Sequence, residues 1–229
     1  MRVLILIDAK NFEQGVFNIS ERINEFRFVD FYKVNNFVMD YLRKNLQYRS
    51  FELLHLRTYF YTGEFTDKLI EKIQSSLEKN PEKIKEIILL LEKCKKNQKI
   101  QEEFFRRAKS YYFFEVRSKP LQFSNVDVKI FQKGVDVQLA SDLVDFTHKN
   151  VFDIAVILSG DIDLLESIKI AKGMGKQTII VGDRSVTAEE MKKIADLYVD
   201  IGKLEKEELN KFSEYRQLMS LTREFGYRV

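Results

Sequence analysis

The chain has 229 residues and a mass of 27.2 kDa, a length typical of one α/β domain with modest insertions. Its 38 Lys and Arg residues against 35 Asp and Glu residues leave a net charge of +3, which disfavours a histone-like binder of bulk nucleic acid and an acidic disordered tail. The single cysteine excludes an intramolecular disulfide and a zinc site built from several cysteines, and only two histidines are present.

Buried strands and amphipathic helices alternate along most of the chain. Continuous apolar runs, typical of strands covered on both faces, predict strands at 3–7, 151–158 and 177–181. Weaker patterns predict further strands at 51–61, 113–117 (near a sheet edge) and 197–201. Apolar residues at helical spacing predict helices over 31–46, 137–147, 164–174 and 188–195. This alternation predicts an α/β fold with a mostly parallel central sheet and helices on both faces.

Two segments exceed what a minimal fold of this kind needs. Residues 12–29 separate the first strand from its helix and contain Arg22 and Arg27. Residues 81–120 hold eight Lys, three Arg and six Glu, so this stretch carries +5 while the rest of the chain sums to −2. Its helical part is either a cationic arm beside an acidic site or a solvated helix face whose lysine stems cover apolar surface.

Carboxylates follow the carboxyl ends of the predicted strands. Asp8 ends the first strand, and Asp161 and Asp163 follow the strand at 151–158. Asp136 lies where a loop turns into a helix. Ligands of open α/β sheets bind beyond the carboxyl ends of the strands, so these acids gather if the topology places their strands side by side. Each has an alternative as a turn residue or helix cap, although two caps two residues apart would be redundant.

Crowded carboxylates repel one another unless a cation lies among them. Oxygen ligands suit Mg²⁺ or Mn²⁺, and the scarcity of Cys and His disfavours zinc. Magnesium commonly shares its coordination with substrate phosphates, so the pattern favours metal-assisted hydrolysis of phosphodiester bonds. Asn11, three residues after Asp8, is either an Asx-turn residue or an amide that orients water or phosphate.

Four sequence elements together resemble the NYN family, the group of PIN-like nucleases that includes the LabA-like proteins. They are D-A-K-N at 8–11, K-G-V-D-V-Q-L-A-S-D at 133–142, S-G-D-I-D-L at 159–164, and G-K at 175–176 before a strand. The resemblance extends from the first strand to about residue 201, and K-G-V-D-V with S-G-D-x-D is its specific part. The chain departs from the family pattern at Lys10, Ile162 and Leu164.

The resemblance implies a three-layer α/β/α PIN-like fold over residues 1–203, with a basic helical insertion at about 81–110. It also implies an endoribonuclease site that depends on Mg²⁺ or Mn²⁺. The residues matching the family's metal-binding acids are Asp8, Asp136, Asp161 and Asp163, and Asn11 matches the amide beside the first acid. The further candidates for substrate binding are Lys133, Ser159, Asp142, Arg22 and Arg27.

The tail and the location of the protein are predicted from composition. Residues 204–229 are expected to form a charged helical tail through which copies of the chain associate. No apolar run approaches the ~18 residues of a membrane span, and the apolar start is shorter than the ~7–15 residues of a signal-peptide core. We therefore expect a cytoplasmic protein without a membrane partner.

Three functional hypotheses follow. The first is a metal-dependent ribonuclease that cuts single-stranded or loop RNA, with basic residues of 95–109 steering the backbone. The aromatics Phe26, Phe28, Tyr111 and Tyr112 either stack on unpaired bases or pack in the core. The second is a non-catalytic RNA-binding or regulatory module with a PIN-like fold. The third is a Toprim-like nuclease, which shares D-x-D after a strand but has Glu where Asp8 stands.

Overall fold

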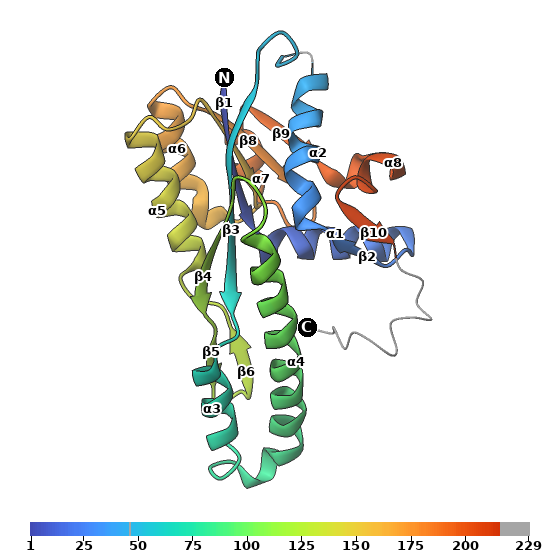
Figure 1. Ribbon diagram of the computed structural model, residues 1–229, viewed down its shortest axis with the longest axis vertical. Helices are drawn as coiled ribbons and strands as arrows, with labels where there is room; N and C mark the ends of the chain where they lie inside the picture. The colour runs from blue at the N-terminus through green and yellow to red at the C-terminus, as the bar shows by residue number, and fades with distance from the viewer. Residues whose placement is uncertain (46, 216–229) are drawn as a thin grey trace.

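A parallel six-stranded sheet forms the centre of the molecule, and its strand order is β4-β3-β1-β7-β8-β9. The computed structural model describes residues 1–45 and 47–215 (Figure 1). From one edge to the other the strands are β4 (Phe114–Pro120), β3 (Leu54–Glu64), β1 (Arg2–Asp8), β7 (Ile154–Leu158), β8 (Gln177–Gly182) and β9 (Leu197–Asp200). All six predicted strands are present, and β4 lies at an edge as predicted.

The direction in which the chain adds strands reverses at β1. From β1 it moves to β3 and β4 on one side, and it then crosses over to β7, β8 and β9 on the other. As a result β1 and β7 are parallel neighbours, with Ile7 beside Leu158. A reversal of this kind is a topological switch point, where open α/β sheets bind their ligands beyond the carboxyl ends of the strands.

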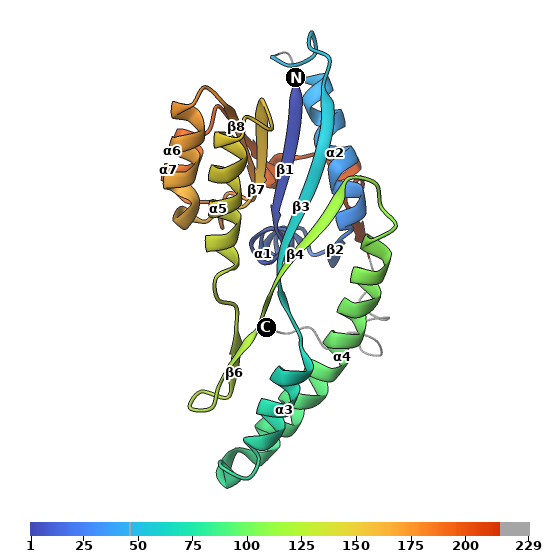
Figure 2. The same cartoon turned by 60° about the vertical axis from the view of Figure 1, so that its left-hand side comes forward.

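Helices cover both faces of the sheet (Figures 1 and 2). One face is covered by α1 (Ala9–Ile23) and α2 (Phe31–Lys44), and the other by α5 (Val135–His148), α6 (Leu165–Gly173) and α7 (Glu189–Ile194). Along β1 the buried side chains alternate, so that Ile5 faces the α1 and α2 side and Leu4 and Leu6 face the α5 side. The three-layer α/β/α prediction is confirmed.

An arm, residues 65–132 before and after β4, extends beyond the carboxyl edge of the sheet (Figure 2). It contains α3 (Asp67–Ser75), the 3-10 turn η1 (Pro81–Lys83), α4 (Ile84–Ala108) and the hairpin of β5 (Gln122–Ser124) and β6 (Lys129–Phe131). The arm has a small core of its own that includes Ile73, Ile87 and Phe123. The basic helix expected at about 81–110 is α4, which returns to the sheet and packs Phe104 against Phe60 with ring centroids 5.0 Å apart, and its status as an insertion stays a prediction.

Residues 12–29 differ from the prediction, because most of this segment belongs to α1. Phe12, Val16 and Ile19 recur at helical spacing and are buried against the sheet. The helix starts directly after Asp8, whose side chain caps it. The short strand β2 (Arg27–Val29) then follows.

The prediction of one C-terminal helix is wrong for residues 204–215. The chain there forms the four-residue helix α8 (Lys206–Leu209) and the strand β10 (Ser213–Tyr215), which pairs antiparallel with β2. Phe212 is buried between Phe12 and Phe37, with ring centroids 5.7 and 4.5 Å away. This segment therefore completes the core of the domain, and residues 216–229 lie outside the described residues. Over the described ranges, no helix combines the length and the apolar character needed to cross a membrane.

Gly160 allows the loop after β7 to pack against the loop that precedes α7. A Cβ atom at position 160 would lie 2.4 Å from the Cα of Thr187 and 2.5 Å from the carbonyl oxygen of Val186. The carbonyl oxygen of Gly160 also accepts a hydrogen bond from the N–H of Ala188 at 3.0 Å. The Oγ1 atom of Thr187 would lie 2.6 Å away, but its rotation could not relieve the two contacts with the backbone.

We expect Gly160→Ala to lower the free energy of unfolding by about 1–3 kcal/mol, because an added methyl group forces the two loops apart. Urea denaturation measures this change. Gly173→Ala is the matched control, because a Cβ there meets nothing within 4 Å. Equal midpoints of unfolding for the two variants would contradict this account of the packing.

Candidate active site

Asp8 joins the ends of the two strands at the switch point. It is the last residue of β1, and its side chain is only 3% exposed. Its Oδ1 atom accepts a hydrogen bond from the N–H of Asn11 at 3.2 Å, which caps α1. Its Oδ2 atom accepts one from the hydroxyl of Ser159, directly after β7, at 3.1 Å.

Asn11 makes a second connection between the same two segments. Its Oδ1 atom accepts a hydrogen bond from the N–H of Gly160 at 2.9 Å. Beyond Gly160, the Oδ1 atom of Asp161 accepts one from the N–H of Asp163 at 3.0 Å and caps the 3-10 turn η2 (Ile162–Leu164). The D-x-x-N and S-G-D-x-D motifs therefore form one hydrogen-bonded unit.

Asp136 approaches from α5. Gly134 precedes the helix with a φ of 81°, a left-handed conformation that costs glycine little because it has no Cβ. This turn places Asp136 in the first turn of α5, where it is half-buried. The structure thus brings the four predicted acids close enough for their charges to interact: Asp8 interacts with Asp136 and Asp161, and Asp136 with Asp161 and Asp163.

Burial and the neighbouring acids raise the pKa of Asp8 and of Asp136. Burial and the charges of Asp136 and Asp161 raise the pKa of Asp8 to about 6, although the hydrogen bonds from Asn11 and Ser159 oppose the shift. Burial and the charges of Asp161 and Asp163 likewise raise the pKa of Asp136. Like charges held together in this way are typical of functional sites.

Glu13 is a further carboxylate near this cluster, and the sequence analysis missed it. It lies on α1, and its side chain reaches solvent. The protein atoms around it reduce its hydration and, together with the charge of Asp8, raise its pKa. Recognition of a helix starting at Ala9 would have placed Glu13 one turn beyond the helix N-terminus, on the side of the acids.

The donor set fits Mg²⁺ or Mn²⁺ by chemistry, because every donor is an oxygen atom. Within residues 1–45 and 47–215, no three Asp, Glu, His or Cys side chains converge closely enough to form a metal site with their side chains as they stand. Asp161 and Asp163 retain solvent exposure, whereas Asp8 is buried and fixed. Coordination of one ion by three or more of these acids therefore requires their side chains to move closer together than they stand.

The model of the NYN domain matches residues 2–205. The chain belongs to the NYN domain family. This family is part of the PIN-like nuclease superfamily, so the resemblance drawn from the sequence motifs is confirmed and the Toprim-like alternative loses its support. A nuclease role follows at the level of the superfamily.

Two curated proteins of Methanocaldococcus jannaschii share short stretches with the chain. An uncharacterized protein is 33% identical over 92 residues, which are 37% of this chain and 38% of that protein. A phosphoribosyl imidazole-4-carboxamide isomerase is 36% identical over 69 residues, which are 30% of this chain and 27% of that enzyme. The chain thus spans well under half of the length of these relatives.

A solved structure shares the fold. The crystal structure of a protein of unknown function from Vibrio parahaemolyticus superimposes with a TM-score of 0.53, covering 93% of this chain and 96% of that one. The two sequences are 16% identical, so this likeness concerns the fold alone.

The predicted substrate-binding residues of the NYN domain lie in several environments. Ser159 is buried and orients Asp8, and Asp142 accepts a hydrogen bond from the hydroxyl of Tyr61 at 2.9 Å. Lys133 is exposed in the loop before α5, and within the described part of the chain its side chain forms no ion pair. Lys133 is therefore an unpaired cation three residues before Asp136.

Arg22 and Arg27 have protein partners. Arg22 pairs with the buried Asp183, which follows β8, and its side chain is 48% exposed. The buried guanidinium of Arg27 donates hydrogen bonds to Asn210 at 2.9 Å and to Ser213 at 3.1 Å. Arg27 thus links β2 to the C-terminal segment and is not part of the proposed substrate surface.

The aromatic candidates pack mainly against other rings. Tyr111 stacks on Tyr32 with ring centroids 4.0 Å apart, and Phe26 lies 6.3 Å from Phe28. Tyr112 is 87% exposed, but it precedes the amino end of β4, whereas the acids follow the carboxyl ends of β1 and β7. Packing therefore accounts for Phe26, Phe28 and Tyr111, and base stacking beside the acids has no support at Tyr112.

The raised pKa of Asp8 makes the stability of the metal-free NYN domain depend on pH. Since the folded pKa of about 6 lies above the ordinary value of 3.8, the folded state binds more protons than the unfolded state between these values. Stability from this group should therefore fall as the pH rises from about 4 to about 6. Asp8→Asn removes the titration and keeps a capping side chain, so in EDTA its Tm should fall less than that of the wild type.

Thermal unfolding from about pH 4 to about pH 8 measures this difference. Asp145→Asn is the control, because Asp145 is an exposed carboxylate that pairs with Lys149. The same pH dependence of Tm in the Asp8→Asn variant and the wild type would show that the pKa of Asp8 is not raised.

Proposed function

We propose that this NYN domain is a metal-dependent endoribonuclease that hydrolyses phosphodiester bonds in single-stranded or loop RNA. The observation that carries the proposal is the gathering of Asp8, Asp136, Asp161 and Asp163 beyond the switch point between β1 and β7. Carboxylates whose like charges interact at short range are costly to hold together without a cation. Membership of the PIN-like nuclease superfamily supports the same reading, and a cytoplasmic location stays a prediction.

Mg²⁺ or Mn²⁺ is the ion we propose, held by the four aspartates. When bound, it would act as a Lewis acid that stabilises the charge developing on the phosphate. Asp8 would supply the fixed ligand, because its two hydrogen bonds hold its carboxylate in one orientation. Within the described residues the Nδ2 atom of Asn11 has no hydrogen-bond partner, so it would donate to a phosphate oxygen.

The positive charge of the arm favours a polyanionic substrate. The residues of the arm, 65–113 and 121–132, include thirteen Lys and Arg and nine Asp and Glu, and the arm extends beyond the edge of the sheet that holds the acids. Basic side chains bind a nucleic-acid backbone by neutralising its phosphates, and this attraction does not depend on base sequence. An RNA strand running from the acids along the arm would therefore meet positive charge.

We expect Asp161→Asn to lower the rate of Mn²⁺-dependent RNA cleavage by about 100-fold or more, because it removes a charge that acts on the phosphate through the ion. The fold should be retained, since removing one of four crowded charges reduces their repulsion in the metal-free protein. Cleavage of a labelled single-stranded RNA gives the rate, and circular dichroism checks the fold. Asp145→Asn is the control on the outer surface of α5, and equal rates in Asp161→Asn and the wild type would rule out the assigned site.

Lys133→Ala should weaken RNA binding a few-fold and reduce the slope of log K against log salt concentration by about 0.7, the value for one phosphate contact with a single strand. Fluorescence anisotropy in the Asp161→Asn background measures binding without cleavage. Lys149→Ala removes a lysine at the far end of α5 and serves as the control. An unchanged salt slope in Lys133→Ala would show that Lys133 makes no phosphate contact.

A further inference from the structure

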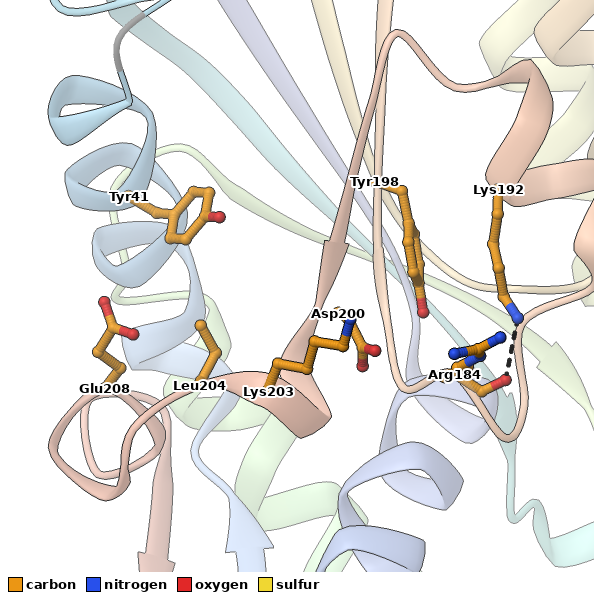
Figure 3. Close-up of a pocket in the computed structure, with 8 residues that line it drawn as sticks. All are labelled: Tyr41, Arg184, Lys192, Tyr198, Asp200, Lys203, Leu204 and Glu208. Carbon is orange, nitrogen blue, oxygen red and sulfur yellow. Dashed lines mark hydrogen bonds between the residues drawn. The ribbon is translucent and has the colours of Figure 1, made fainter.

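A pocket of about 520 Å³ opens beside β9, separate from the acid cluster (Figure 3). Two tyrosines stand on its walls, Tyr41 from α2 and Tyr198 from β9. Three cations line it as well: Arg184 from the loop after β8, Lys192 from α7 and Lys203 from the 3-10 turn η3 (Ile201–Lys203). The volume lies within the usual range for small-molecule sites, about 300–1,000 Å³.

The two aromatic rings are held from opposite walls. The hydroxyl of Tyr198 donates a hydrogen bond to the carbonyl oxygen of Gly182 at 3.1 Å, and the Nζ atom of Lys192 lies 6.0 Å from its ring centroid. Tyr41 packs on the main core through α2, and its ring stands on the other side of the pocket (Figure 3). Tyrosine rings in fixed positions suit a planar base, because every nucleobase has a face that stacks.

Of the three cationic side chains of the pocket, one has protein partners and two have none among the described residues. Lys192 pairs with Glu189 at 2.8 Å and donates to the carbonyl oxygen of Arg184 at 3.3 Å, which holds the loop after β8 against α7. The side chains of Arg184 and Lys203 are exposed and make no ion pair or hydrogen bond within the described residues. A free guanidinium and a free ammonium at one opening are suited to a phosphate group.

The acidic residues of the pocket favour a nucleotide over inorganic phosphate. Asp200 accepts a hydrogen bond from the N–H of Gly202 at 3.1 Å, and Glu208 stands near Tyr41 with its carboxylate unpaired in the described part of the chain. Carboxylates disfavour inorganic phosphate but accept hydrogen bonds from ribose hydroxyls and from the amino groups of bases. Rings, cations and acceptors in one pocket therefore match the parts of a nucleotide.

We propose that this pocket binds one nucleotide unit, with its base at Tyr41 and Tyr198 and its phosphate at Arg184 and Lys203. A free nucleotide and a nucleotide of an RNA strand share this chemistry. The second source rests on the proposed function and is supported by position, because Arg184 and Lys203 follow the carboxyl ends of β8 and β9, at the edge of the sheet where the acids follow β1 and β7. The Arg22–Asp183 pair connects α1, which starts at the acids, with the loop after β8 that carries Arg184.

The test measures binding of AMP to the full chain in EDTA by isothermal titration calorimetry. The double variant Arg184→Ala/Lys203→Ala should bind AMP at least tenfold more weakly than the wild type. Lys193→Ala/Lys211→Ala, which removes two exposed lysines that do not line the pocket, should bind like the wild type. Tyr198→Leu should weaken the binding of AMP and leave the binding of inorganic phosphate unchanged, with circular dichroism confirming the fold.

A second experiment tells whether the pocket takes a free nucleotide or a nucleotide of an RNA strand. It measures the binding of labelled single-stranded RNA in the Asp161→Asn background. Weaker RNA binding in the Arg184→Ala/Lys203→Ala variant assigns the pocket to the RNA strand, whereas an effect on AMP alone assigns it to a free nucleotide. If neither AMP nor RNA binding responds, or if inorganic phosphate binds as well as AMP and Tyr198→Leu has no effect on AMP, the proposal is overturned. AMP binding in a protein that cleaves no RNA would leave this pocket in place and remove the nuclease function.

Discussion

The candidate site depends on the two hydrogen-bonded connections between the end of β1 and the segment after β7. The carboxylate of Asp8 accepts from Ser159, and the amide oxygen of Asn11 accepts from the N–H of Gly160. Both connections use neutral donors, so they fix Asp8 in place without neutralising its charge. A salt bridge at the same place would hold the strands together equally well but would remove the negative charge that an ion needs.

The fold places this concentration of charge at the switch point, beyond the carboxyl ends of β1 and β7. Because the strand order reverses at β1, the connections that leave β1 and enter β7 run over opposite faces of the sheet and diverge at the carboxyl ends of these two strands. The loop after β7 then packs closely on residues 186–188, which is possible because position 160 carries no side chain. Such sites commonly reduce the stability of the protein in return for function. Here the raised pKa of Asp8 means that ionisation of its carboxyl group destabilises the folded state.

The sequence predicts the sheet well and places the acids at its carboxyl edge, because both depend on local patterns, and the role of these acids stays a prediction. Fully buried strands such as β7 are continuous apolar runs, and acids that directly follow them must lie at the carboxyl edge. Glu13 was missed because α1 was not recognised in a segment that is half polar. The strands β2, β5, β6 and β10 have only three residues each, too few for a clear alternating pattern, and β2 and β10 also pair with each other from opposite ends of the chain. Arg27 shows the same limit, since its burial is compensated by Asn210 and Ser213 more than 180 residues away.

The most direct test of the central claim is the cleavage of a fluorescent single-stranded RNA by the wild type and by Asp8→Asn, each with Mn²⁺ and with EDTA. The account predicts cleavage by the wild type in Mn²⁺, no cleavage in EDTA, and no cleavage by a folded Asp8→Asn variant in either condition. Cleavage that persists in EDTA, or that the variant performs at the wild-type rate, would contradict a metal-dependent site built on Asp8.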